Sequence, residues 1–303
     1  MKRYAFTLFA LLTVISVTSQ NRFDLFYVEG SSNFMKTPAT DLNKNFETNI
    51  MSNLSVPIVF KDSSVWFTSL DYQYFSVNGD YSVAMPVEEF NLHGFILRTG
   101  YIYKFNSKKS LQVLFAPRLM SDFNASVSNS LQPGAIVMYE NAKSKDMIWR
   151  VGVLYNQEFF GPYIVPVVYL DWRIAGKVKL TGLLPVYGKL YYHANEKFDI
   201  GLHFIGLTTS YRIDQPSYKN YYIDRRSIDV SLFTKVHLFD NVFMEVRAGY
   251  SLSRDYGLFA KDDKMDFALP LVNIGDDRIR ANNEFGGSPF IRFRLLYSIP
   301  TNK

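Results

Sequence analysis

The sequence of 303 residues contains no cysteine. This absence excludes disulfide bonds, thiolate zinc sites, cysteine nucleophiles and anchoring as a lipoprotein. Long apolar runs are also missing. After the N-terminal segment no stretch approaches the about 18 residues that a membrane helix requires, and the mean hydropathy is only −0.06. The composition therefore excludes a helical membrane protein.

The N-terminal segment has the features of a secretory signal peptide. Lys2 and Arg3 precede a mostly apolar run over residues 4–15, and short side chains follow before Gln20. We therefore predict a signal peptide over residues 1–19 and a mature domain over residues 20–303, with a retained anchor helix as the alternative. An exported chain that lacks cysteine and spans a membrane without helices indicates the outer membrane of a Gram-negative bacterium.

Charge and aromatic content narrow the class further. The net charge is +5, and the sequence pI is about 9.1, but the basic residues are dispersed along the chain rather than gathered in a patch. This dispersal excludes nucleic acid as a partner. Aromatic residues make up 17% of the chain, with 26 Phe and 21 Tyr. Such an excess is typical of the aromatic girdles at the two interfaces of a membrane barrel.

Residues 46–74 carry the clearest structural signal. Even positions from Phe46 to Phe60 are mostly apolar and odd positions are mostly polar, which is the period of two expected for a β-strand. Residues 61–64 form a turn, and the alternation resumes through Tyr74. A tilted strand needs about 9 to 11 residues to cross a bilayer. The segment therefore predicts a hairpin that crosses the membrane twice.

The same alternation repeats along the chain and predicts an all-β, antiparallel transmembrane β-barrel of about 14 strands. Connections after even-numbered strands are short, and those after odd-numbered strands are mostly long, as in bacterial outer-membrane barrels. Loops are expected over residues 31–44, 78–91, 121–133, 214–226 and 254–287, and two short strands over residues 178–194. If residues 178–194 and 134–140 are miscounted, 12 strands is the alternative. A secreted sandwich or lipocalin-like barrel is disfavoured by strand length and by the bulky aromatics on the apolar face.

Three segments resemble an outer-membrane barrel family that is known as a domain of unknown function. They are residues 119–123 (LMSDF), 183–192 (LLPVYGKLYY) and 264–278 (KMDFALPLVNIGDDR). The resemblance covers most of the mature chain. It implies the barrel fold and the outer-membrane location, and it implies no catalytic residues.

Strand parity predicts which charged side chains line the lumen. The predicted lumen-lining residues are Arg98, Arg118, Arg150, Asp171, Arg173, Asp229, Lys235, Glu245, Arg247, Arg292 and Arg294, together with Glu47 and Asp71. An anion-biased aqueous channel is one interpretation, because rings of Arg select for anions. The favoured interpretation is a lumen in which each Arg pairs with a carboxylate of a neighbouring strand. The spacings of Asp171 with Arg173 and of Glu245 with Arg247 suit such pairing.

The long loop before the last strand is a second candidate site. Residues 267–274 could fold inward as a plug, and Asp276, Asp277, Arg278 and Arg280 could belong to that plug or pair with the barrel wall. Asp262, Asp263 and Asp266 add further carboxylates, but their spacing fits no calcium loop. We therefore expect neither a metal nor another cofactor.

Nothing in the sequence completes a catalytic site. Four histidines are present, with His93 expected near the outer rim and His193, His203 and His237 nearer the periplasm, and no Ser and Asp accompany His93 at a suitable spacing. Tyr218, Tyr221 and Tyr222 are expected in an interfacial girdle.

The sequence thus predicts a passive channel or a small-solute or lipid transport barrel, and not an enzyme. A closed structural or surface-binding barrel is the first alternative, and a lipid-modifying enzyme is the second. Expected partners are outer-membrane lipid, lipopolysaccharide and the barrel-insertion machinery, and the oligomeric state is left open.

Overall fold

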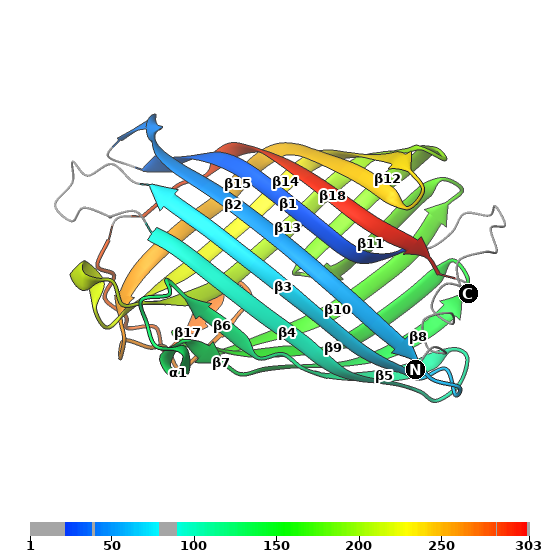
Figure 1. Cartoon of the computed structure of the whole chain (residues 1–303), viewed down its shortest axis with the longest axis horizontal. Coiled ribbons are helices and arrows are strands. Elements are labelled where there is room, and N and C mark those ends of the chain that lie inside the picture. Colours follow the sequence, from blue (N-terminus) through cyan, green and yellow to red (C-terminus); the bar gives the residue numbers. More distant parts are fainter. Residues whose placement is uncertain (1–21, 38–39, 79–89, 283, 302–303) are drawn as a thin grey trace, which may run out of the picture.

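The computed structural model describes residues 22–37, 40–78, 90–282 and 284–301 (Figure 1). The predicted signal peptide lies outside these residues. The strands are β1 (Arg22–Thr37), β2 (Thr40–Val59), β3 (Val65–Asn78), β4 (Phe90–Lys104), β5 (Lys109–Phe115), β6 (Arg118–Ser121), β7 (Leu131–Gln132), β8 (Gly134–Ser144), β9 (Met147–Glu158), β10 (Gly161–Ala175), β11 (Val178–Leu184), β12 (Tyr187–Asn195), β13 (Phe198–Ile213), β14 (Tyr221–Phe239), β15 (Val242–Ala260), β16 (Phe267–Leu269), β17 (Val272–Ile274) and β18 (Ser288–Pro300). Short helices α1 (Val127–Ser130) and η1 (Pro216–Tyr218) lie in loops. Among the described residues no helix is long and apolar enough to cross a membrane.

Antiparallel pairing between successive strands closes the sheet on itself. β5 and β6 share one position in the wall, β7 and β8 share the next, and β18 pairs with both β15 and β1. The result is a closed barrel of 14 strands. The predicted strand number and the two short strands over residues 178–194 are confirmed.

Side chains alternate between the interior and the outer surface as the period of two requires. In β2, Glu47 and Asn49 are fully buried, whereas Ile50, Leu54 and Ile58 are 44%, 50% and 54% exposed. A soluble barrel or sandwich would show the opposite arrangement, because its apolar face would point inward. The outward apolar face therefore makes this a transmembrane barrel.

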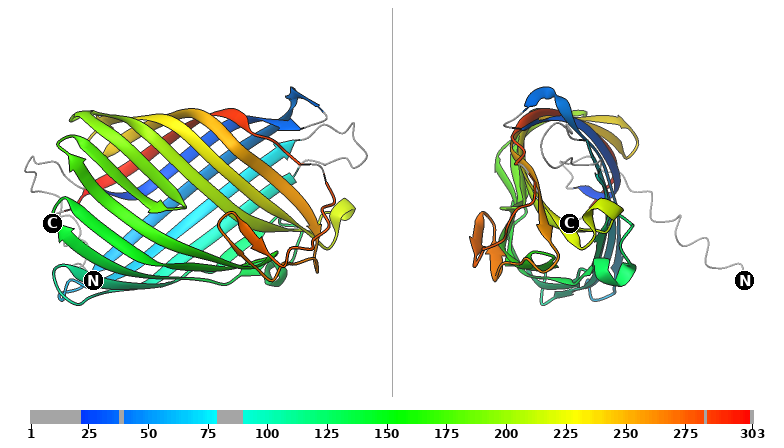
Figure 2. Two further views of the ribbon diagram at one scale, coloured as in Figure 1. Left: turned by 180° about the vertical axis from the view of Figure 1, so that it is seen from behind. Right: turned by 90° about the vertical axis from the view of Figure 1, so that its left-hand side faces the viewer.

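The two ends of the barrel differ in their connections. Residues 60–64, 105–108, 145–146, 176–177, 196–197 and 240–241 form short connections at one end, which we call the turn end. Arg22 pairs with Pro300, so both described termini lie at this end. The longer connections among the described residues, 122–130, 214–220 and 261–287, lie at the other end, the loop end. Figure 2 shows α1, η1 and the β16–β17 hairpin gathered there. The predicted segregation of loops by parity is confirmed.

Several predicted loops are wrong because strands extend into them. β1 continues to Thr37 and β2 begins at Thr40, where a loop over residues 31–44 was expected. Ser31 and Asn33 are polar because they face the interior, where they are buried. β14 begins at Tyr221, inside the loop expected over residues 214–226. Most of the predicted loop at 78–91 lies outside the described residues.

The loop expected to begin at Arg254 is shorter because β15 continues to Ala260. The cause of the error is a β-bulge, since Ile228 pairs with Ser253 while Asp229 pairs with Ser251. The extra residue of a bulge reverses the alternation of the strand that contains it. Inward positions therefore change from odd, at Ser251, to even, at Arg254, and the sequence pattern loses its period.

Candidate functional site

An ion-pair network occupies the barrel interior beside β15, β18, β1 and β2. Glu47 lies between Arg225 and Arg254, and Asp229 lies between Arg254 and Arg292. Glu29 lies between Arg292 and Arg247, and Glu245 between Arg247 and Lys189. The network thus alternates cation and carboxylate across six strands, from Arg225 on β14 to Lys189 on β12.

The interior charge of this network is not balanced. Five cations alternate with four carboxylates, and Arg294 adds another cation 3.6 Å from a Glu29 oxygen. All nine alternating side chains except Lys189 are at most 5% exposed. The Nε atom of Arg254 has no hydrogen-bond partner among the described residues, whereas the Nε atoms of Arg292 and Arg294 lie 3.5 and 3.6 Å from Glu29 oxygens. The interior on this side therefore carries an excess of positive charge.

Glu47 is the most heavily bonded carboxylate of the network. It accepts hydrogen bonds from the amides of Asn33, at 2.7 Å, and Asn49, at 2.9 Å, and from the Tyr256 hydroxyl. Arg225 and Arg254 complete its surroundings. Because its partners come from β1, β2, β14 and β15, Glu47 joins strands that are not neighbours in the sheet.

The interior near β4, β9 and β10 is more open at the turn end. The side chains of Arg98, Arg150 and Arg173 are each 32% exposed. Each of the three still has a carboxylate partner, respectively Asp71, Glu140 and Asp146. An interior arginine can remain exposed only where solvent reaches the lumen, so the lumen is accessible on this side.

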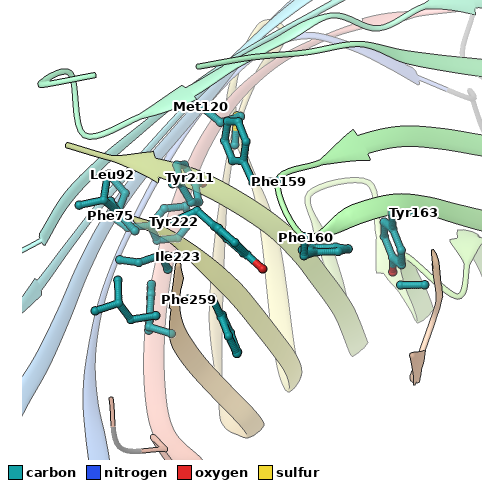
Figure 3. Close-up of a cluster of buried hydrophobic side chains, with 14 of the residues drawn as sticks. Phe75, Leu92, Met120, Phe159, Phe160, Tyr163, Tyr211, Tyr222, Ile223 and Phe259 are labelled. Carbon is teal, nitrogen blue, oxygen red and sulfur yellow. The ribbon is translucent and has the colours of Figure 1, made fainter. Parts of the chain in front are cut away.

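The loop end of the barrel is mainly apolar, apart from the buried pair of Arg118 and Glu158. Its buried cluster includes the residues labelled in Figure 3, namely Phe75, Leu92, Met120, Phe159, Phe160, Tyr163, Tyr211, Tyr222, Ile223 and Phe259. These side chains come from β3, β4, β6, β10, β13, β14 and β15 and from the turn between β9 and β10. Each is at most 9% exposed. Two of them, Tyr222 and Phe259, stack on the outward face of β14 and β15 and are covered by the long loop.

Direct contacts between opposite walls close this end of the barrel. Tyr211 on β13 packs edge-on against Phe75 on β3, with ring centroids 6.2 Å apart, and its hydroxyl donates to Gln73 over 3.1 Å. Arg225 on β14 lies 4.0 Å from the centroid of the same Phe75 ring. The outer ends of β13 and β14 thus lie across the lumen against β3.

Residues 15–275 match the family DUF6268, which is described as a domain of unknown function. The chain belongs to this family. A comparison with curated proteins found no match.

Among solved structures the DUF6268 barrel is similar to several outer-membrane proteins. They include the NanC porin, with 11% identity over 89% of this chain and 98% of that chain and a TM-score of 0.36. The Pseudomonas putida toluene transporter TodX has 9% identity over 95% and 91% of the chains, with a TM-score of 0.37. The KdgM porin has 10% identity over 90% and 99%, with a TM-score of 0.34. The likeness concerns the barrel fold alone.

The remaining predicted interior residues of the DUF6268 barrel are divided among local pairs. Arg118 pairs with Glu158 at the loop end, where both are buried. Asp171 pairs with Lys179 at 2.8 Å, and Arg173 pairs with Asp146 at 3.7 Å. Lys235 lies 4.6 Å from the centroid of the Phe243 ring. Of the two pairs expected from spacing, Glu245 with Arg247 is present in the structure at 2.6 Å.

The plug expected over residues 267–274 is wrong in its position. Ala268 of β16 pairs in parallel with Tyr163 of β10, so the segment adds to a sheet edge rather than entering the lumen. Arg278 pairs with Asp224 of β14 at 3.1 Å, and Arg280 pairs with Asp255 of β15 at 2.6 Å. These two residues therefore bind the wall, which is the alternative the sequence left open.

The same loop borders an outer pocket of about 330 Å³ that Arg226, Arg278 and Arg280 line together with carboxylates. Asp276 accepts hydrogen bonds from Arg278, and these bonds hold the pKa of the Asp276 carboxyl below its usual value. Asp277 is exposed. All three arginines are paired with carboxylates.

The predicted tyrosine girdle and the histidines lie in different surroundings. Tyr218 and Tyr222 are buried, at 7% and 0% exposure, so they do not form an interfacial girdle. The outward face of β14 is covered here by the long loop, whose Asp263 carbonyl accepts from the Tyr222 hydroxyl over 2.6 Å. His93 stacks on Phe123 at 4.4 Å near the loop end. The other histidines are distributed separately: His193 bonds Asp199, His203 is buried, and His237 stacks on Phe243.

Four members of the network were missed from the sequence: Glu29, Lys189, Arg225 and Arg254. Arg225 and Arg254 lie in segments that were expected to be loops, and Lys189 lies in the ambiguous stretch over residues 178–194. Ile223, Arg225 and Ser227 continue the odd-numbered inward positions of the strand that follows them. This alternation is the signal that would have placed Arg225 inside the barrel.

Proposed function

We propose that this protein is an outer-membrane transport barrel that takes up small anionic molecules with an apolar part and is closed at its loop end at rest. The observation that supports this proposal most strongly is the division of the interior. Charged side chains at the turn end are exposed to the lumen, whereas aromatic side chains seal the loop end. A permanently open pore would leave the interior exposed at both ends.

The charge of the interior supports an anionic solute. The ion-pair network has more cations than carboxylates, and the Nε atom of Arg254 has no hydrogen-bond partner among the described residues. Arginine binds carboxylate and phosphate groups through its planar set of donors. The aromatic cluster above the network supports an apolar part of the same solute.

Location and partners belong to the same proposal. Residues 1–19 would direct export, and the barrel-insertion machinery would place the chain in the outer membrane with its outward apolar face against lipid and lipopolysaccharide. Exposed aromatic side chains near the turn end, among them Phe60, Tyr103 and Phe239, suit the inner interface of that membrane.

Single-channel recording in a planar bilayer tests the resting state. We expect the wild-type barrel to show no stable openings, and Tyr211→Ala to show stable, anion-selective openings, because this change removes the ring that meets Phe75 and the hydroxyl that binds Gln73. Tyr250→Ala is the matched control, since Tyr250 is 49% exposed on the outer surface. Stable openings in the wild type would contradict the closed resting state.

Binding of a dansyl-labelled alkyl carboxylate in detergent tests the ligand class. We expect a saturable rise in dansyl emission with the wild type and weaker binding with Arg294→Ala, because Arg294 is the network cation that lies 3.5 Å from the Tyr27 ring centroid and remains 15% exposed. A barrel that neither binds the probe nor conducts as Tyr211→Ala would instead be a closed structural or surface-binding barrel.

A further inference from the structure

The barrel wall is incomplete between β10 and β13. The β11–β12 hairpin separates these strands only near the turn end, because its last pairs are Val168 with Leu184 and Tyr187 with Ile205. Closer to the loop end, residues 161–167 of β10 and residues 207–213 of β13 form no strand pairing with each other in the described structure. We call this unpaired stretch of wall the seam. Figure 2 shows the short hairpin ending part-way along the barrel.

The β10 side of the seam faces lipid, because its outward residues Ile164, Pro166 and Val168 are apolar. β11 has 7 residues and β12 has 9, whereas a tilted strand needs about 9 to 11 residues to cross the hydrocarbon region. The seam therefore begins beside the end of β11, within the hydrocarbon region, and its outer end lies at the level of Thr208, which pairs with Arg226 of the charged outer pocket. Within hydrocarbon an unsatisfied backbone group is costly, so the two edges of the seam must be satisfied without a strand between them.

The edge of β10 that faces the seam lacks backbone N–H donors at two positions. The Arg173 N–H donates to the Asp146 carbonyl on the β9 side, and backbone groups alternate between the two edges of a strand, so even-numbered residues of β10 face the seam. Pro162 and Pro166 occupy two of these positions, and proline has no N–H to leave unsatisfied. A central strand would not tolerate them, whereas an edge does.

The edge of β13 is satisfied by side chains and a loop. The Ser210 N–H donates to the Glu158 carboxylate over 2.9 Å, and its carbonyl accepts from the Gln132 amide over 3.2 Å. The Arg212 carbonyl accepts from the Asp122 N–H over 3.0 Å. Each of these groups belongs to a different element, so no continuous ladder holds the edge in place.

Side chains seal the seam where backbone pairing is missing. The Tyr163 hydroxyl of β10 is hydrogen-bonded to Thr208 of β13. The Phe159 N–H donates to the Ser210 hydroxyl over 2.8 Å, and the Arg212 guanidinium lies 4.5 Å from the centroid of the Phe159 ring. Side-chain contacts of this kind open by rotation about single bonds, which a strand ladder cannot do.

The β16–β17 hairpin covers the outer part of the β10 edge. It is attached by the pairing of Ala268 with Tyr163 and by the Met265 N–H, which donates to the Phe160 carbonyl over 2.9 Å. Its far side exposes apolar residues: Leu271 is 86% exposed and Val272 is 49% exposed. An apolar tip beside a seam in the membrane wall is suited to contact lipid rather than water.

The interior surface behind the seam is apolar, and charge lies close beneath it. Val165 and Val167 of β10 are buried there, and Leu183 and Leu207 pack against the same apolar cluster. Lys189 of the ion-pair network follows Tyr187, the residue at which β12 begins. A molecule at this level would meet an apolar surface on the side of the seam and cations below it.

We propose that the seam between β10 and β13 is a lateral opening through which the alkyl tail of an anionic amphiphile passes between the barrel interior and the outer leaflet. The anionic head would remain with the arginines and Lys189, while the tail leaves between Tyr163 and Thr208. This inference deepens the proposed function and rests on it for the direction of use, but the opening itself can be tested separately.

Because the chain has no native cysteine, a single introduced thiol reports access at one chosen place. Val165→Cys puts a thiol on the interior side of the seam, and Met138→Cys puts one at an equally buried interior position of β8, which is paired on both sides. Both barrels are reconstituted in phosphatidylcholine vesicles, and N-dodecylmaleimide is dissolved in the bilayer. The fraction alkylated is followed by mass spectrometry, and folding is checked by heat-modifiable gel migration.

We expect the thiol at position 165 to react on the order of tenfold faster than the thiol at position 138, which corresponds to roughly 1.4 kcal/mol in the free energy of local opening. Equal rates in two folded barrels would overturn the lateral opening. If Val165→Cys fails to fold, Val167→Cys takes its place on the same interior face.

The outcome is distinguishable from failure of the proposed function. Fast labelling at position 165 without binding of the dansyl probe would establish the opening and remove the anionic transport role. Binding of the probe with equal labelling rates would keep the transport role and assign the route to the ends of the barrel.

Discussion

Two parts of the barrel wall satisfy their backbone hydrogen bonds in different ways. Along β15, β18, β1 and β2, backbone ladders are continuous and the interior is filled by the ion-pair network. Between β10 and β13, the ladder stops at the β11–β12 hairpin, and side chains and a short hairpin complete the wall. The first arrangement fixes the strands relative to one another, and the second leaves a place where they can separate.

This difference in hydrogen bonding shows which part of a membrane barrel can open while the rest of the wall stays fixed. Every backbone group in lipid has to be satisfied, so a wall can loosen only where its hydrogen bonds go to side chains or to removable segments. The interior chemistry follows the same division, because charge lies along the ladder-paired wall and apolar side chains lie behind the seam. Changes to the first wall should alter stability, and changes to the second should alter access.

The largest effect is expected from Arg254→Met in the first wall. Arg254 is fully buried and pairs with both Glu47 and Asp229. Removing one member of a buried ion pair leaves carboxylates poorly compensated, which typically costs about 3–5 kcal/mol. The free energy of unfolding in urea, followed by the fluorescence of the three tryptophans, measures this loss.

Arg98→Met is the matched control for that measurement. Arg98 also pairs with a carboxylate, Asp71, but its side chain is 32% exposed to the lumen. Water screens such a pair, and exposed pairs are worth about 0–1 kcal/mol. Similar losses for the two variants would show that the interior of the first wall is as hydrated as the opposite side.

Part of this arrangement was predictable from the sequence. The period of two placed Ile50 and Leu54 outside and Glu47 inside, and the connection lengths gave the number of strands. Glu245 and Arg247 were paired correctly because residues two apart on a strand share a face. These features depend only on local geometry, which a sequence records directly.

Other parts depend on contacts that no local pattern contains. Arg225 and Glu47 are separated by 178 residues, and only closure of the barrel brings them together. The bulge opposite Asp229 hides the inward position of Arg254. Tyr222 faces outward by parity and is nevertheless buried, because the loop that carries Asp263 covers it. The seam likewise arises because the β11–β12 hairpin is shorter than its neighbours β10 and β13.

A smaller effect is expected from Tyr163→Phe at the seam. The change keeps the aromatic ring and removes the hydrogen bond to Thr208, which is worth about 1 kcal/mol. In the Val165→Cys background we expect alkylation by N-dodecylmaleimide to become several-fold faster, with little change in the overall unfolding free energy. The ratio of labelling rates with and without Tyr163→Phe measures the contribution of this contact to the seal.

Tyr155→Phe provides the comparison for the seam variant. Tyr155 also loses a side-chain hydrogen bond, to Gln157 at 2.7 Å, but it lies on β9, which is paired with strands on both sides. Faster labelling in both variants would mean that any loss of a tyrosine hydroxyl loosens the barrel. The seam would then have no special role.

The smallest effect concerns pH and the loop that carries the hairpin beside the seam. Hydrogen bonds from Arg278 hold the pKa of Asp276 below its ordinary value of 3.8. A lowered pKa in the folded state means that the stabilisation is complete above this ordinary value and is lost as the pH falls through the lower, folded value.

Pepsin, which is active in that range, should therefore cut within residues 261–287 more readily at the acidic side. Asp276→Asn should be cut similarly on both sides, whereas Asp277→Asn, a change at the exposed neighbour, should retain the wild-type dependence on pH. An unchanged dependence in Asp276→Asn would assign the acid response to another carboxyl and separate the fastening of this loop from the Arg278 contact.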